Sequence, residues 1–150
     1  MSAKIKLALT VQFPDPRLKK QLPKAAIKTA VQAALFAPAE FTLRFVDAAE
    51  GKILNRDFRG KDYATNVLTF AYTEDCDAEV TLADIIFCTD VLQQEATAQN
   101  KSVLNHTLHL IVHGVLHAQG YDHENEDEAA EMEALETSIL AGLGVADPYR

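Results

Sequence analysis

The residues from Asn105 to His123 read NHTLHLIVHGVLHAQGYDH, and the rest of the chain is organised around this stretch. Apolar residues occupy most of its sides, which predicts a buried helix with Asn105 as its N-cap. Gly120 is expected to end the helix, because glycine adopts the left-handed conformation beyond a C-terminus without steric cost. The histidines of such a helix are expected to line a cleft in the body of the protein.

Three histidines of this stretch have the spacing of metal ligands. His113 and His117 are four residues apart, so a helix places both imidazoles on one face. His123 follows the turn at Gly120 and can fold back towards them. Catalytic zinc sites commonly use three protein ligands and keep the fourth position for water. We predict one zinc ion bound by His113, His117 and His123. Ordinary packing is the alternative, and it is the usual explanation for a single histidine.

The other two histidines, His109 and His106, lie one and two turns before His113, respectively. A tetrahedral site cannot easily take ligands from three successive turns of one helix and from His123 as well. We therefore expect His106 and His109 to line the site, to support it or to pack, and not to bind the ion.

The spacing also resembles the long metzincin motif, HExxHxxGxxH. In that motif the glutamate after the first histidine is the general base of peptide hydrolysis. The corresponding residue here is Gly114. The ligand pattern is present without the base, so a metallopeptidase is an alternative and not the main hypothesis.

Length and composition predict a single domain over residues 1–150. The 48% hydrophobic and 24% charged residues are typical of a globular protein. Apolar runs are too short for a membrane span, and the first residues look like a strand rather than a signal peptide. Cys76 and Cys88 suggest no disulfide framework, so a reducing cytoplasm is expected.

Charge is distributed unevenly along the chain. Residues 1–61 contain 12 Lys and Arg against 5 Asp and Glu, a balance of +7, and the remainder has 2 against 17, a balance of −15. The two halves sum to the net charge of −8. Part of the surface can therefore attract an anionic partner although the total is negative. Solvated helix faces of opposite sign explain the asymmetry equally well.

Periodicity predicts the remaining elements. Alternating or continuous apolar residues indicate strands at 5–13, 41–45, 67–72 and 83–88, the last of them central in the sheet. Helical spacing indicates helices at 22–35, 47–60, 92–100 and from Asn125 or Asp127 to Gly142. We predict an α+β fold with a single mixed sheet of about four strands, packed with helices around the buried HxxxH helix.

The helix predicted at 47–60 has clear end signals. Asp47 followed by Glu50 is typical of a capping box, and Gly60 is the expected stop. Ile53, Leu54 and Phe58 are expected to face inward.

Three segments together resemble the YbeY family of rRNA maturation endoribonucleases. They are HGVLHAQGYDH, LNRDFRGKDYATNVLTF at Leu54 to Phe70, and EMEALE at Glu131 to Glu136, within a resemblance from about Phe41 to Tyr149. It implies a metal-dependent, single-strand-specific endoribonuclease that acts in 16S rRNA 3′-end maturation and ribosome quality control in the bacterial cytoplasm. It places the metal ligands on His113, His117 and His123, and the essential arginine on Arg59.

The resemblance agrees with the chemistry of the residues. Phosphodiester cleavage develops charge on phosphate oxygens, which the guanidinium of Arg59 can bind with two donors. A bound zinc ion lowers the pKa of its water towards about 7 and polarises phosphate, and the 2′-hydroxyl of RNA is a nucleophile supplied by the substrate. Arg56 and Lys61 are weaker candidates for contacts with the RNA backbone.

The expected partner is single-stranded RNA of the 16S precursor, with the ribosome or a ribosomal protein as a further candidate, and no membrane or DNA is expected. One further alternative is a non-catalytic ribosome-assembly factor in which the metal only holds the fold.

Overall fold

A computed structural model of the chain describes residues 5–61, 65–72, 80–120 and 125–149. The strands of this part are β1 (Leu7–Gln12), β2 (Ala39–Val46), β3 (Val67–Ala71) and β4 (Thr81–Cys88). The helices are η1 (Pro16–Leu18, a 3-10 turn), α1 (Lys24–Ala33), α2 (Ala48–Arg59), α3 (Thr89–Ala98), α4 (Val103–Ala118) and α5 (Glu126–Gly142). The predicted order of elements and the α+β class are confirmed.

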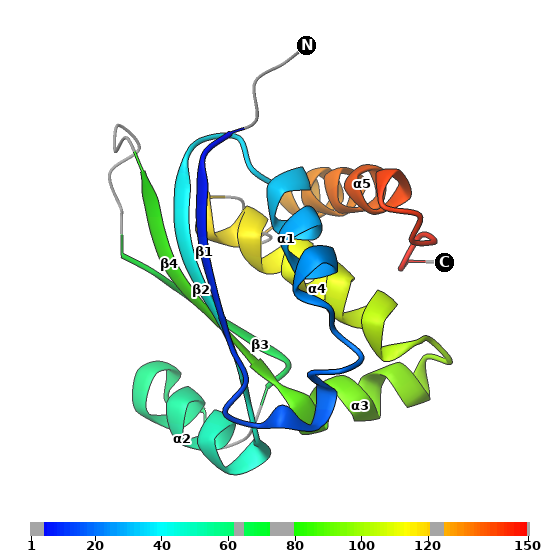
Figure 1. Cartoon of the computed structure of the whole chain (residues 1–150). Coiled ribbons are helices and arrows are strands. Elements are labelled where there is room, and N and C mark those ends of the chain that lie inside the picture. Colours follow the sequence, from blue (N-terminus) through cyan, green and yellow to red (C-terminus); the bar gives the residue numbers. More distant parts are fainter. Residues whose placement is uncertain (1–4, 62–64, 73–79, 121–124, 150) are drawn as a thin grey trace.

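The four strands form one mixed sheet in the order β1-β2-β4-β3. β1, β2 and β4 are parallel, and β3 pairs antiparallel with β4. β4 is therefore an interior strand, as its apolar run predicted. Figure 1 shows α1, α4 and α5 on one side of the sheet and α2 on the other. Residues 73–79, between β3 and β4, lie outside the described residues.

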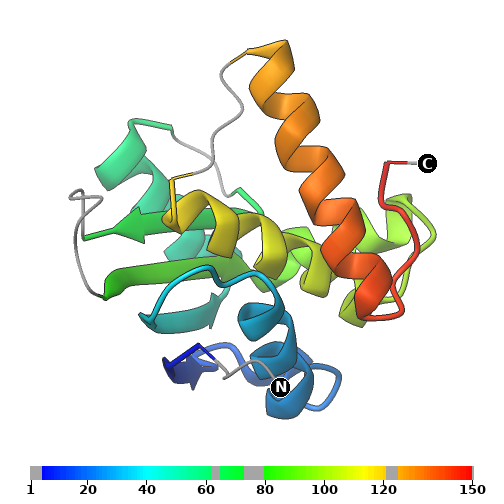
Figure 2. The same ribbon diagram turned by 90° about the horizontal axis from the view of Figure 1, so that it is seen from above.

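Helix α4 lies at the centre of the fold, as expected from its apolar sides. It contacts β3 and β4 on the sheet and also α1, α3 and α5, and α5 crosses over it (Figure 2). Its N-cap is Ser102, whose hydroxyl accepts a hydrogen bond from the Asn105 backbone N–H at 3.0 Å. The prediction of Asn105 as N-cap was wrong, because Val103 and Leu104 extend the helix by a turn and Ser102 supplies an equally good cap. Gly120 follows the helix with φ of +104°, as predicted.

Helix α2 is capped as predicted but packs less completely. Asp47 accepts from the Glu50 backbone N–H, and Gly60 has φ of +71°. The inward orientation predicted for Ile53 and Phe58 was wrong, since 47% and 67% of their surfaces are exposed. Only Leu54 packs with Val46, Leu68 and Ile86 beneath the helix. The Phe58 ring meets the Phe70 ring edge-on at 5.2 Å and otherwise faces solvent.

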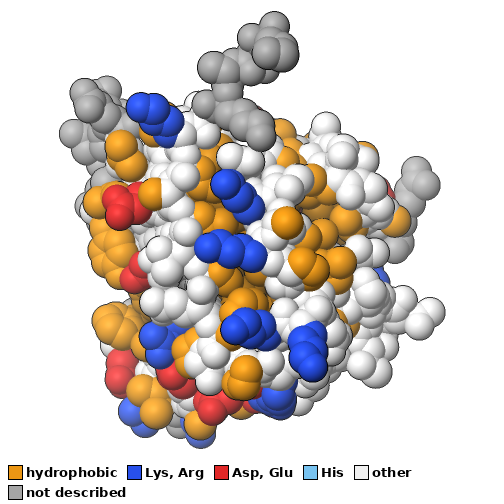
Figure 3. Space-filling model, in the orientation of Figure 1, with side chains coloured by type: hydrophobic (Ala, Val, Ile, Leu, Met, Phe, Trp, Pro, Cys, Tyr) orange, Lys and Arg blue, Asp and Glu red, His pale blue; other side chains and the backbone are white. Residues whose placement is uncertain are grey.

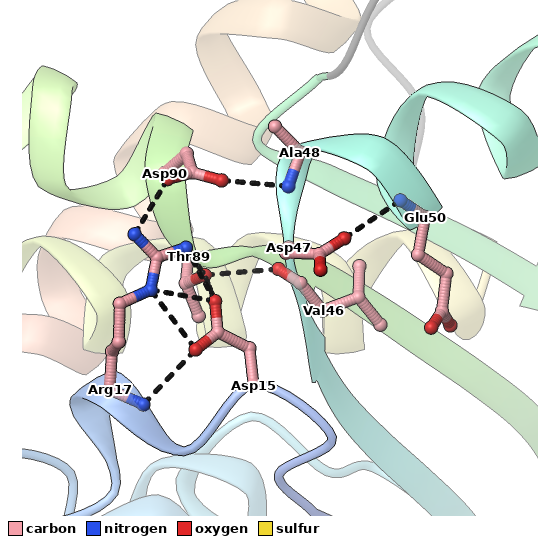
Figure 4. A network of polar contacts seen from close by, with 8 residues as sticks. All are labelled: Asp15, Arg17, Val46, Asp47, Ala48, Glu50, Thr89 and Asp90. Carbon is pink, nitrogen blue, oxygen red and sulfur yellow. Dashed lines mark hydrogen bonds and ion pairs between the residues drawn. The ribbon is translucent and has the colours of Figure 1, made fainter.

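A polar network links η1 to the start of α2 and α3 (Figure 4). The Arg17 guanidinium donates to Asp15, with Nε 2.9 Å from Oδ2, and its other end lies 2.7 Å from Asp90 Oδ1. The buried Thr89 hydroxyl donates to Asp15, and Asp90 Oδ2 accepts from the Ala48 N–H at 2.7 Å. Hydrogen bonds from Arg17 hold the pKa of the Asp15 and Asp90 carboxyls below their usual range, against the effect of burial.

This network predicts acid sensitivity. A carboxyl whose pKa is lower in the folded than in the unfolded state stabilises the fold above its unfolded pKa of about 3.9, and that stabilisation is lost as pH falls through the folded pKa. We expect the free energy of unfolding, measured by urea titration, to fall as pH drops from about 5 to 2. Asp15→Asn is expected to lower the free energy of unfolding by about 1.5–3 kcal/mol at pH 7. It is also expected to make the free energy of unfolding depend less on pH between about 5 and 2. Equal slopes for the variant and the wild type would contradict a stabilising role of the Asp15 charge.

Candidate metal centre

Two of the three predicted ligands lie together on α4. The rings of His113 and His117 are on the same face of the helix, with centroids 5.8 Å apart and planes tilted by 54°. Both side chains are partly buried. His123 lies outside the described residues, and within the described ranges no group of three or more His, Cys, Asp or Glu side chains forms a metal cluster. The three-histidine set therefore remains a prediction, with two of its members adjacent.

The carboxylate of Glu136 lies beside His113 and His109. Only 1% of Glu136 is exposed, although it belongs to the solvent-facing helix α5. Its Oε1 lies 3.0 Å from His109 Nε2, and the carboxylate lies 3.3–3.4 Å from His113 Nδ1. Burial alone would raise the pKa of Glu136, but the two histidines outweigh it and lower the pKa to about 2. The carboxylate is therefore ionised and acts only as an acceptor.

Sequence reasoning missed Glu136 as a site residue. The signal was its position, four residues after Met132 and four before Leu140, both of which are buried. A glutamate on the apolar stripe of a helix is rarely buried without a partner. Here the hydrogen-bond partners of Glu136 include His109 and His113 on α4, so a glutamate can lie on the buried face of α5.

The C-terminal segment reaches the same carboxylate. The Tyr149 hydroxyl donates to Glu136 Oε1 at 3.1 Å and lies 3.2 Å from His109 Nε2. Burial and the charge of Glu136 raise the pKa of Tyr149, so its hydroxyl stays protonated as a donor. Lys101 donates to the Pro148 carbonyl at 3.3 Å and helps to hold the segment in place.

A cavity of about 260 Å³ opens between α4 and α5. Its lining residues are His113, Ala129, Met132, Glu133, Glu136 and Tyr149. The expectation that the histidines line a cleft is confirmed for His113.

The Nε2 atoms of His106 and His109 each form a hydrogen bond with a carboxylate. His106 Nε2 lies 2.9 Å from Glu95 Oε1, and His109 Nε2 is bound to Glu136. The Nδ1 atoms of both rings are buried and have no hydrogen-bond partner among the described residues. We assign the proton to Nε2 in each ring, because a carboxylate requires a donor and an unpartnered buried N–H is costly. Both histidines are thereby engaged in packing and support within α4.

Gly114 is held against the sheet. A Cβ atom at this position would lie 3.1 Å from Ile85 Cγ2 on β4 and 3.5 Å from Thr69 Oγ1 on β3. The side of α4 that would have to carry the peptidase glutamate therefore has no room for one. This packing weakens the metallopeptidase alternative.

The predicted RNA-contacting residues lie at the end of α2. Arg59 is the last residue of the helix, and the position of its side chain is outside what the structure describes. Arg56 is exposed and pairs with its neighbour Asp57 at 3.2 Å, and Lys61 is exposed beyond Gly60. A phosphate approaching Arg56 would compete with that carboxylate. An approach of Arg59 to the histidines stays a prediction.

Basic residues also gather around η1 and α1. In Figure 3, Lys and Arg side chains run down the middle of the face, and Asp and Glu lie mainly towards its left and lower edges. The exposed lysines of this region are Lys19, Lys20, Lys24 and Lys28. In the described part of the chain none of these four pairs with a carboxylate. The charge asymmetry of the sequence therefore corresponds to a region of positive surface.

The described donors suit zinc. Two imidazoles on one helix face match the nitrogen ligands that zinc accepts, and a carboxylate behind one of them is the usual support of a zinc-bound histidine. His113 and His117 would hold the ion together with His123.

The fold and the histidine helix define an α+β protein whose central helix carries an HxxxH pair. The solution structure of TM1509 from Thermotoga maritima shares this fold, with a TM-score of 0.56 and 23% identity over 95% of this chain and 99% of that one. None of the helices in the described ranges is both long and apolar enough to cross a membrane.

The family follows from the sequence comparison. The family model described as Endoribonuclease YbeY matches residues 8–144. Proteins named Endoribonuclease YbeY are 66% identical in Janthinobacterium sp. (strain Marseille), covering 99% of this chain and 98% of that protein, and 60% identical in Herminiimonas arsenicoxydans, covering 96% of each. The chain belongs to the YbeY family.

Proposed function

We propose that this protein is a metal-dependent endoribonuclease that cleaves single-stranded RNA, with zinc held by His113, His117 and His123. The observation that carries the proposal is the pair of adjacent imidazoles on α4, one of which, His113, lies against the buried Glu136 carboxylate. Membership of the YbeY family, whose relatives are named endoribonucleases, supports the reaction class.

The roles of the chain's own residues follow from their chemistry. The histidines hold the ion, which when bound supplies Lewis acidity towards a phosphate oxygen. Arg59 binds the non-bridging oxygens and stabilises the charge that develops on them. The exposed Lys61 and Arg56 attract the RNA backbone, so the affinity for RNA falls with salt concentration.

The substrate we propose is the 3′ region of the 16S rRNA precursor, cleaved in the cytoplasm during ribosome maturation and quality control. The candidate partner is the ribosome or a ribosomal protein. The support is the resemblance over the histidine, FRGKD and EMEALE segments. In cells lacking the protein, the 16S precursor is expected to accumulate and the wild-type gene to restore maturation. Normal 3′ ends in such cells would contradict this substrate.

The reaction is tested with purified protein whose zinc content is measured on the same sample. The wild type with about one zinc per chain is expected to cleave a single-stranded RNA and to leave its duplex form intact. A chelator is expected to stop cleavage, and added zinc to restore it.

His117→Ala is the control in that assay, since it removes one of the two adjacent ligands. It is expected to lose both zinc and cleavage. Equal cleavage by the variant and the wild type would identify the activity as a contaminant. A wild type that neither contains zinc nor responds to it would exclude zinc as the metal.

A further inference from the structure

The carboxylate of Glu136 has two hydrogen-bond partners besides His113. His109 Nε2 and the Tyr149 hydroxyl both lie on Oε1, at 3.0 and 3.1 Å. The His109 and Tyr149 rings also meet edge-on, with centroids 5.4 Å apart. Donors from α4 and from the C-terminal segment thus hold one carboxylate that belongs to α5. Its orientation is determined independently of His113.

This fixed acceptor decides which nitrogen of His113 carries a proton. The carboxylate already receives the Tyr149 hydroxyl and His109 Nε2 on Oε1, and it presents oxygen acceptors to His113 Nδ1 at 3.3–3.4 Å. A neutral imidazole with Nδ1–H presents the lone pair of Nε2. The arrangement therefore selects the tautomer of His113 that binds a metal through Nε2, and it limits rotation of the ring.

We propose that Glu136 is a positioning residue of the metal centre, which sets the tautomer and orientation of His113 and is itself held by His109 and Tyr149. The proposal rests on the proposed function in so far as His113 binds the ion. It also gives the C-terminal segment a role, because Tyr149 connects the end of the chain to the metal centre.

The test compares zinc affinities, measured by competition with a chromophoric chelator at a temperature at which every metal-free variant is folded. Glu136→Gln is expected to bind zinc about 10- to 100-fold more weakly than the wild type, the usual effect of removing a partner behind a metal-bound histidine. Tyr149→Phe keeps the ring and loses one donor to Glu136. A loss of a few-fold is expected for it, smaller than for Glu136→Gln because His109 still holds the carboxylate.

Glu133→Gln is the matched control. Glu133 lies on the same helix, lines the same cavity and is exposed, and its removal changes the charge by the same amount. It is expected to change zinc affinity by less than about twofold, since exposed charges act weakly. An equal loss in Glu133→Gln and Glu136→Gln would mean that only the net charge matters, and would overturn the proposal.

A second measurement separates positioning from mere packing. The ¹⁵N shifts of the His113 ring in the metal-free wild type are expected to report a proton on Nδ1, and in Glu136→Gln a mixture of tautomers. Unchanged tautomer and unchanged zinc affinity in a folded Glu136→Gln would overturn the proposal and leave the proposed function intact. A wild type that binds no zinc would overturn both. If Glu136→Gln does not fold, Tyr149→Phe decides, and wild-type affinity in that variant would overturn the proposal.

Discussion

Arg59→Ala is expected to retain its zinc and to cleave single-stranded RNA at least about a hundredfold more slowly than the wild type. The loss of one preorganised donor to a developing oxyanion typically costs about 10²–10³ in rate. The fold should be preserved, because Arg59 is the last residue of α2 and is followed by the cap residue Gly60. Alanine is also the best helix former. Single-turnover cleavage with zinc content measured in parallel checks this result.

Arg56→Ala is the control for that variant. Arg56 is on the same helix, one turn earlier, and its exposed side chain pairs with Asp57. Its substitution by alanine removes the same charge as Arg59→Ala. We expect an effect of less than about fivefold on the cleavage rate, because Arg56 only attracts the RNA backbone. The slope of log affinity for RNA against log salt concentration is expected to be smaller by about one unit. Similar rates for Arg59→Ala and Arg56→Ala would remove Arg59 from the catalytic role. If Arg59→Ala also supported normal ribosome maturation, the non-catalytic assembly factor would become the better explanation.

Gly114→Glu is expected to lose on the order of 5 kcal/mol of stability and to leave little folded protein. A Cβ at this position is already 3.1 Å from Ile85, and the rest of a glutamate would enter the sheet. The cost combines overpacking, about 1–3 kcal/mol, with burial of a charge that has no partner. The total free energy of unfolding of a natural domain is only about 5–15 kcal/mol. Urea unfolding followed by circular dichroism measures the loss.

Gly142→Glu is the matched substitution. Gly142 is also a helical glycine, but nothing lies within 4 Å of the Cβ that would be added. Its replacement is expected to change stability by less than about 1 kcal/mol, since glycine is a poor helix former and the site is open. A Gly114→Glu protein as stable as the wild type would show that the contact with the sheet does not restrict this position. In that case the peptidase alternative would regain the space for its base.

Local signals in the sequence were sufficient for most elements. The alternation of apolar residues, the Asp47 cap and the glycines at 60 and 120 are properties of a few adjacent residues, and the structure has the corresponding strands and helix ends. The cap of α4 was misplaced because Ser102 and Asn105 are both good caps, and only the packing of Val103 and Leu104 decides between them.

The inward faces were harder to predict. Phe58 and Ile53 have the spacing of a buried stripe, but α2 lies on a sheet face whose apolar patch is small, and the two side chains extend beyond it. A hydrophobic pattern states which residues can be buried. The extent of the partner surface decides which of them are.

The sequence by itself determined the elements of this protein, the buried character of the central helix and the pairing of His113 with His117 on one of its faces. These features depend on helical geometry and on apolar periodicity, which act over a few residues. Only the tertiary structure decided the strand order, the contact that keeps position 114 a glycine, and the place of Glu136 behind His113. Each of these joins segments that are distant in the chain, and the pattern of one segment carries no information about the surface that another will present to it.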